Sequence, residues 1–89
     1  MSDWVDLRYG YVVRETEKAA LLEVRATIKR PGRRPDHGEL LEIWIPKKLL
    51  RTGGRGCYRL PRSIVEQKET EAAKKLGAEC VGIAVFEEE

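Results

Sequence analysis

The most regular hydrophobic pattern in the chain is an alternation with a period of two across residues 19–28. Every second side chain in this segment is apolar, and these residues are Ala20, Leu22, Val24, Ala26 and Ile28. Such alternation is typical of a strand that buries one face. A helix over AALLEVRAT is the alternative, but the polar positions keep alternating through residue 28. We therefore expect a strand, joined by a short hairpin turn over residues 16–18 to an earlier strand that begins near Tyr9.

Residues 29–38 interrupt this pattern. Their sequence, KRPGRRPDHG, holds two prolines and two glycines, so we expect a loop. Alternation resumes over residues 39–45, and Pro46 is expected to end this strand because proline has no backbone donor for the ladder. One face of the strand carries Leu41, Ile43 and Ile45, and the other carries Leu40, Glu42 and Trp44.

A helix is predicted after residue 62. Ser63 and Glu66 have the spacing of a capping box, in which the two side chains accept hydrogen bonds from unpaired amides at the start of a helix. Glu71 can pair with Lys75 one turn later, and Gly77 is placed to end the helix in the left-handed conformation. The apolar side of this helix carries Ile64, Val65, Ala72, Ala73 and Leu76.

These elements indicate a small α+β domain. Residues 51–56 (RTGGRG) have the composition of a loop, residues 57–60 that of a short strand, and residues 81–85 alternate as a C-terminal strand. We expect an antiparallel β-meander or a partly closed barrel, with an OB-like arrangement as one candidate, covered by one helix and completed by the C-terminal strand. The whole chain forms one domain, in which the leader, residues 1–8, and the acidic tail, residues 87–89, are expected to be flexible.

Charge is segregated along the chain although the net charge is only +2. The segment from Val24 to Arg62 holds eleven basic and three acidic residues, a net charge of +8, and the remainder of the chain carries −6. A field this asymmetric favours a polyanionic partner on the basic side.

Several classes of protein are disfavoured. The chain has no apolar stretch long enough to span a membrane and its acidic start lacks a signal peptide, so a cytoplasmic location and no membrane partner are expected. Cys57 and Cys80 are expected to be free thiols, and a single histidine, His37, leaves no plausible zinc quartet. No catalytic signature is present. We expect no cofactor, no metal and no enzymatic activity.

Two stretches of the chain carry a resemblance. Residues 16–19 read T-E-K-A and residues 43–47 read I-W-I-P-K. This pattern resembles that of small uncharacterised proteins of phages, plasmids and bacterial islands, which commonly read T-E-K-A and then W-[IL]-P-K-S. Lys48 stands here where the serine usually lies. The resemblance covers residues 16–48 and implies a strand–hairpin–strand core and a home on mobile DNA, with no activity to transfer.

The leading functional hypothesis is binding of single-stranded DNA or RNA. Two Arg/Lys-rich loops supply charge for phosphate contacts, and an outward aromatic ring between them could stack on a base. The candidate nucleic-acid-binding residues are Arg30, Arg33, Arg34, Trp44, Lys47, Lys48, Arg51 and Arg55.

Two alternatives stay open. Trp44 is outward by the phase of its strand, but it could instead pack beneath the helix or Leu40. The chain could also be a protein–protein interaction module or a small inhibitor or accessory protein of a mobile element. Such a module would self-associate or bind a partner through an exposed sheet edge.

Overall fold

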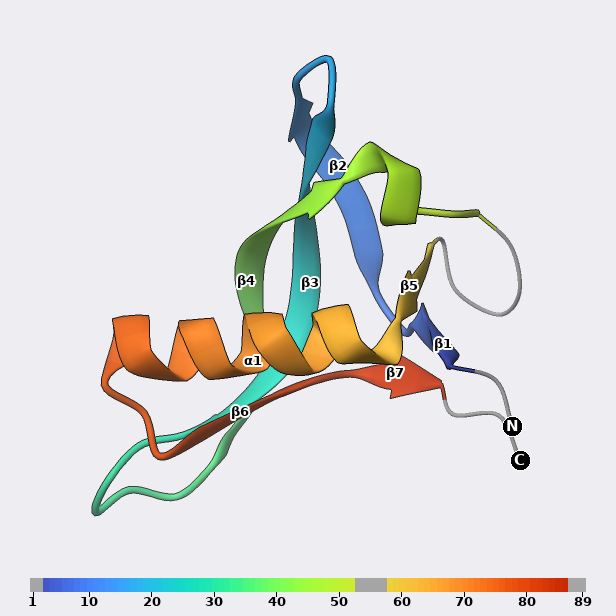
Figure 1. The fold of residues 1–89 in the computed structure, drawn as a ribbon. Helices are drawn as coiled ribbons and strands as arrows, with labels where there is room; N and C mark the ends of the chain where they lie inside the picture. The colour runs from blue at the N-terminus through green and yellow to red at the C-terminus, as the bar shows by residue number, and fades with distance from the viewer. Residues whose placement is uncertain (1–2, 53–57, 87–89) are drawn as a thin grey trace.

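The two segments with the clearest alternation form the longest hairpin of the fold. In the computed structural model, which describes residues 3–52 and 58–86, β3 (Ala19–Lys29) pairs antiparallel with β4 (Asp36–Pro46) along the full length of both strands. Figure 1 shows the arrangement. β2 (Gly10–Glu15) lies on the other side of β3. The predicted β-meander is therefore present.

Seven strands in two antiparallel sheets and one helix make up the described residues, so the fold is α+β. The meander sheet has the order β2-β3-β4, with β6 (Cys80–Ile83) also paired to β3. The second sheet has the order β5-β1-β7. Its strands are β5 (Arg59–Pro61), β1 (Trp4–Leu7) and β7 (Val85–Phe86). The two sheets do not close into a barrel, so the fold is a partly closed meander.

The helix α1 (Arg62–Leu76) covers the inner face of the meander (Figure 1). The alternation of β3 places five apolar side chains on this face, and each is no more than 1% exposed. The main core cluster consists of Val5, Leu7, Leu22, Val24, Ile43, Ile45, Leu60, Val65 and Ile83. The described part of the chain contains no helix that is long and apolar enough to span a membrane.

The leader is not a flexible segment where the structure describes it. Residues 4–7 form β1, which pairs with β5 and β7, and Val5 and Leu7 are 1% and 0% exposed. Asp6 on the same strand lies 3.0 Å from Nε of Arg59. The expectation for residues 1–8 is therefore wrong over β1, and residues 87–89 of the tail lie outside the described residues.

The loop predicted for residues 29–38 is shorter than expected. β3 continues to Lys29 and β4 already begins at Asp36, so only residues 30–35 connect the strands. The pairing register shifts between Ala26 and Ile28, and Gly38 has φ of +78°. A bulge of this kind lets the ladder continue through a glycine that composition alone assigns to a loop.

The predicted capping box is not formed. α1 begins at Arg62 after Pro61, and no side chain caps it. The first amide is satisfied at long range instead, because Arg62 N–H donates to the carbonyl of Asp3 at 2.6 Å. Ser63 thus lies inside the first turn. The other end of the helix follows the prediction, since Gly77 has φ of +66° and its N–H donates to carbonyls of the last turn.

Candidate interaction surface

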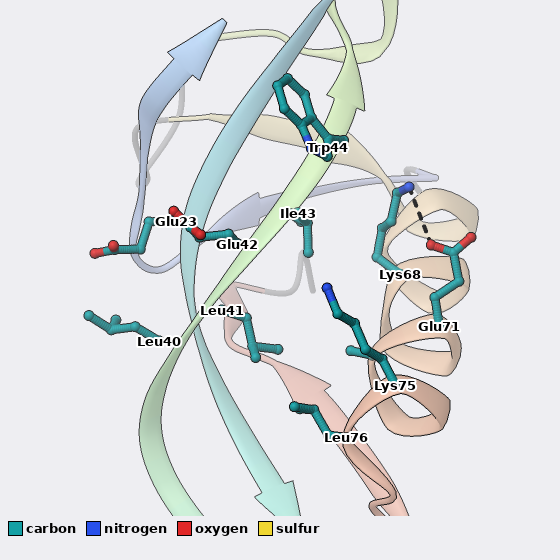
Figure 2. Close-up of a pocket in the computed structure, with 11 residues that line it drawn as sticks. Glu23, Leu40, Leu41, Glu42, Ile43, Trp44, Lys68, Glu71, Lys75 and Leu76 are labelled. Carbon is teal, nitrogen blue, oxygen red and sulfur yellow. Dashed lines mark hydrogen bonds and ion pairs between the residues drawn. The ribbon is translucent and has the colours of Figure 1, made fainter.

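An open groove of about 490 Å³ runs between β4 and α1. We call it the β4 groove, and its lining residues are Glu23, Leu40, Leu41, Glu42, Ile43, Trp44, Lys68, Glu71, Ala72, Lys75 and Leu76. Figure 2 shows Leu41 and Ile43 pointing from β4 toward α1, while Leu40 and Glu42 point to the other side of the strand. The alternation of β4 therefore gives the groove an apolar floor, and Leu40, Glu42 and Trp44 form its outer border.

One edge of β4 borders this groove without a neighbouring strand. Among the described residues, β3 is the one strand that pairs with β4. Along a strand, the backbone N–H and C=O groups of successive residues point alternately to its two edges. About half of these groups in the eleven residues of β4 therefore face the unpaired edge. An unpaired edge of this length can accept a further strand.

Exposed apolar side chains gather around the same strand. Leu40 is 48% exposed, Trp44 is 42% exposed and Leu76 on α1 is 38% exposed, and all three line the β4 groove. The two flanking residues of Trp44 are buried, with Ile43 at 6% and Ile45 at 0%. Of the two alternatives for Trp44, the structure therefore shows the outward ring.

The charges of the β4 groove are mixed. Glu23, Glu42 and Glu71 bring three carboxylates, and Lys68 and Lys75 bring two ammonium groups. Lys68 Nζ lies 3.4 Å from Glu71 Oε2, so Glu71 pairs with Lys68 and not with Lys75 as the spacing predicted. Lys75 has no ion pair within residues 3–52 and 58–86, and Figure 2 shows its side chain extending from α1 toward β4.

A tyrosine cluster lies on the outer face beside the groove. The hydroxyls of Tyr9 and Tyr11 both donate to Glu23 Oε1, at 3.3 and 3.0 Å, and their rings meet edge to face. The hydrogen bond to Glu23 raises the pKa of Tyr11 to about 12, because it stabilises the neutral phenol. Arg25 lies over the Tyr9 ring at 5.5 Å from its centroid. This part of the outer face thus combines two aromatic rings with one carboxylate and one guanidinium group.

The first basic segment is partly neutralised. Arg30 contacts Asp36 at 3.1 Å and Glu39 at 3.3 Å, and the hydrogen bond with Glu39 raises the pKa of the guanidinium. Arg33 and Arg34 are exposed, and neither side chain forms an ion pair with another described residue. Two of the three arginines predicted to bind phosphate are therefore available to a ligand.

The second basic segment is partly engaged as well. Lys47 lies 3.7 Å from Glu15, and the guanidinium of Arg51 stacks over Trp4 at 4.8 Å from the ring centroid. Lys48, in the short 3-10 helix Lys47–Leu49, is exposed without an ion pair to any described residue. Arg55 falls outside the described residues.

The structure does not bring the two basic segments together. Residues 30–35 follow one end of the β3–β4 hairpin, and Lys47 N–H donates to Lys18 at the other end. The eleven residues of β4 separate them by about 33 Å at the rise of a strand. Trp44 lies nearer the Lys47 end. The predicted site residues therefore form two separate clusters and not one continuous patch.

Of the residues that line the β4 groove, Trp44 alone was among the predicted binding residues. Lys75 was assigned to a pair with Glu71, and Leu76 to the buried side of the helix. Leu76 is exposed at the last position of α1, where it borders the groove. No local pattern in the sequence signals this, because it depends on where β4 lies relative to α1.

No protein-family model, curated protein or solved structure matches the chain. The described residues hold no cluster of three or more His, Cys, Asp or Glu side chains that could bind a metal ion. His37 is exposed, with Nδ1 3.2 Å from the Thr27 hydroxyl. Cys80 is an exposed free thiol, and Cys57 lies outside the described residues. The β4 groove and the two basic ends are thus the features on which a function can be based.

Proposed function

We propose that the protein is an interaction module that binds an extended segment of a partner along the free edge of β4. The observation that carries this proposal is the juxtaposition of an unpaired eleven-residue strand with the β4 groove. Strand addition needs an open edge for main-chain hydrogen bonds and a surface beside it for alternate side chains. The free edge supplies the first, and Leu41, Ile43 and Ala72 supply the second.

The exposed apolar residues support the same proposal. Leu40, Trp44 and Leu76 border the groove, where a docked strand would remove them from water. Aromatic side chains at the centre of an interface commonly provide much of its binding energy. The mixed charges of the groove suit a polypeptide, which can carry charges of both signs, better than a polyanion.

Selection from a displayed library of random twelve-residue peptides tests this proposal. Peptides that bind the full chain should lose about tenfold or more in affinity for Trp44→Ala and for Leu76→Ala. Val13→Ala is the matched control, because Val13 is 39% exposed on β2 and does not line the β4 groove. Failure to select any peptide, or an equal loss in all three variants, would contradict the proposal.

Single-stranded nucleic acid is the second candidate ligand. It is favoured by the exposure of Trp44 and by the three cations without ion pairs, Arg33, Arg34 and Lys48. A bound nucleic acid would have to span about 33 Å to contact both basic clusters, at residues 30–35 and near Lys48. Titration with single-stranded DNA, single-stranded RNA and duplex at two salt concentrations tests it. The expected slope of log affinity against log salt is near −0.7 per phosphate for single strands, and absence of binding at low salt would eliminate this candidate.

A further inference from the structure

The β4 groove has an uneven distribution of paired and unpaired charge. On the α1 wall, Lys68 is satisfied by Glu71, whereas Lys75 has no counter-ion among the residues described. Figure 2 shows the Lys75 side chain reaching toward β4, beside the apolar side chains of Leu41 and Leu76. Lys75 is exposed, and a carboxylate of a ligand can pair with its ammonium group without breaking an ion pair between described residues.

The chemistry of the ligand follows from the three surfaces that it would touch. The edge of β4 requires an extended backbone, and the floor of Leu41, Ile43 and Ala72 requires apolar side chains on the inward-facing positions. Lys75 requires an acidic side chain at one of these positions. An extended segment satisfies all three requirements when its inward-facing side chains are apolar except for one carboxylate.

A second copy of the chain satisfies these requirements less well. A symmetric pairing of two β4 strands centred on the groove segment, residues 40–44, would place Glu42 directly opposite Glu42 of the copy, where like charges destabilise a sheet. Glu42 lies on the outer phase of β4, and on the inward phase both oxygens of Glu39 already bond to Arg30. A segment of a different protein therefore fits the groove better than this pairing of two copies does.

We infer, on the basis of the proposed function, that the β4 groove binds an acidic, extended segment of another protein, and that Lys75 selects it by pairing with one carboxylate. Lys75 acts as a specificity residue, while the edge of β4 and the apolar floor supply contacts that any strand could use. A change at Lys75 should therefore alter the preference for an acidic side chain without abolishing the binding of an extended segment.

A charge-reversal selection tests this inference. The random peptide library is selected against the wild-type chain, against Lys75→Glu and against Lys74→Glu. Lys74 is the matched control, because it lies in the same last turn of α1, is exposed, and does not line the β4 groove. Both variants change the net charge and the helix terminus equally. Synthetic peptides of one enriched sequence, with Glu, Gln or Lys at the acidic position, are then titrated against each protein.

The wild type and Lys74→Glu should both enrich Asp or Glu at one position flanked by apolar residues, and Lys75→Glu should enrich Lys or Arg there. The Glu peptide should bind Lys75→Glu about tenfold or more weakly than wild type, and the Lys peptide should recover that loss. Peptides that bind with no acidic preference would overturn the inference and leave the proposed function intact. A dimer in sedimentation that Glu42→Lys alters would overturn it by identifying a second copy as the occupant. Failure to enrich any peptide would overturn the proposed function, and the inference with it.

Discussion

At the scale of single residues, Trp44 shows how far the phase of one strand determines exposure. Its neighbours Ile43 and Ile45 are buried in the core, while the Trp44 ring is 42% exposed on the opposite face. Leu21 of β3 is paired with Trp44, so the two side chains lie on the same face of the hairpin. The alternation of the sequence places Trp44 opposite Ile43 and Ile45, but its exposure also depends on no other element covering this face, which the structure shows.

The first prediction concerns the stability of a Trp44 variant. Trp44→Ala should lower the free energy of unfolding by about 1 kcal/mol or less, as changes at exposed positions do. A buried tryptophan would cost about 3 to 5 kcal/mol. Urea denaturation measures the difference, and a loss in the larger range would show that the ring packs into the core.

Ser63 provides the second prediction, and it reverses what the sequence alone suggests. Ser63→Ala should leave the denaturation midpoint unchanged, because α1 begins at Arg62 and no side chain caps it. A capping serine would cost about 1 kcal/mol on the same substitution. A loss of that size would show that the capping box forms in solution.

At the scale of elements, the helix shows which features a local pattern can and cannot predict. Gly77 ends α1 as expected, because the left-handed conformation is a property of one residue. The helix begins close to the predicted residue, but its first amide donates to the carbonyl of Asp3, which is remote in the sequence, and no local pattern could indicate this partner. The shortened loop at residues 30–35 has the same origin, since its ladder depends on pairing between β3 and β4.

Glu69 links α1 to β6 and gives the third prediction. Its carboxylate accepts the Ile83 N–H at 2.7 Å, and burial raises the pKa of Glu69 more than this hydrogen bond lowers it. The folded state therefore holds the proton more tightly than the unfolded state. The resulting stabilisation is full below the unfolded pKa and is lost as the pH rises through the folded pKa.

Glu69→Gln tests this link, because an amide oxygen can still accept the Ile83 N–H without a charge. The variant should gain stability relative to wild type as the pH rises above the folded pKa of Glu69. Carbon-13 NMR titration of the side-chain carboxyl measures that pKa directly. A value at or below that of an exposed glutamate would contradict the account.

At the scale of the whole molecule, β1 joins the start of the chain to its end. Its central position between β5 and β7 makes residues 4–7 part of the core. The alternation of Val5 and Leu7 is too short to be recognised as a strand in the sequence, and only its partners reveal it. The same limit applies to the candidate site, because the sequence shows which residues are basic but not that a hairpin holds them about 33 Å apart.

Leu7→Ala is the fourth prediction. Leu7 is 0% exposed and belongs to the main core cluster, so the substitution should cost about 2 to 5 kcal/mol. Thermal and urea unfolding both report this loss. An unchanged stability would be the result expected of a flexible leader, and it would contradict the position of β1 in the core.

Amide hydrogen exchange along β4, with and without a selected peptide, tests the central claim most directly. In the free protein, every second amide of β4 should exchange quickly, because only β3 pairs with this strand among the residues described. Saturating peptide should protect this fast set and leave the amides of β2 unchanged. If the peptide leaves the exchange of the fast β4 amides unchanged, or protects only residues 30–35 and 47–52, strand addition at β4 is contradicted.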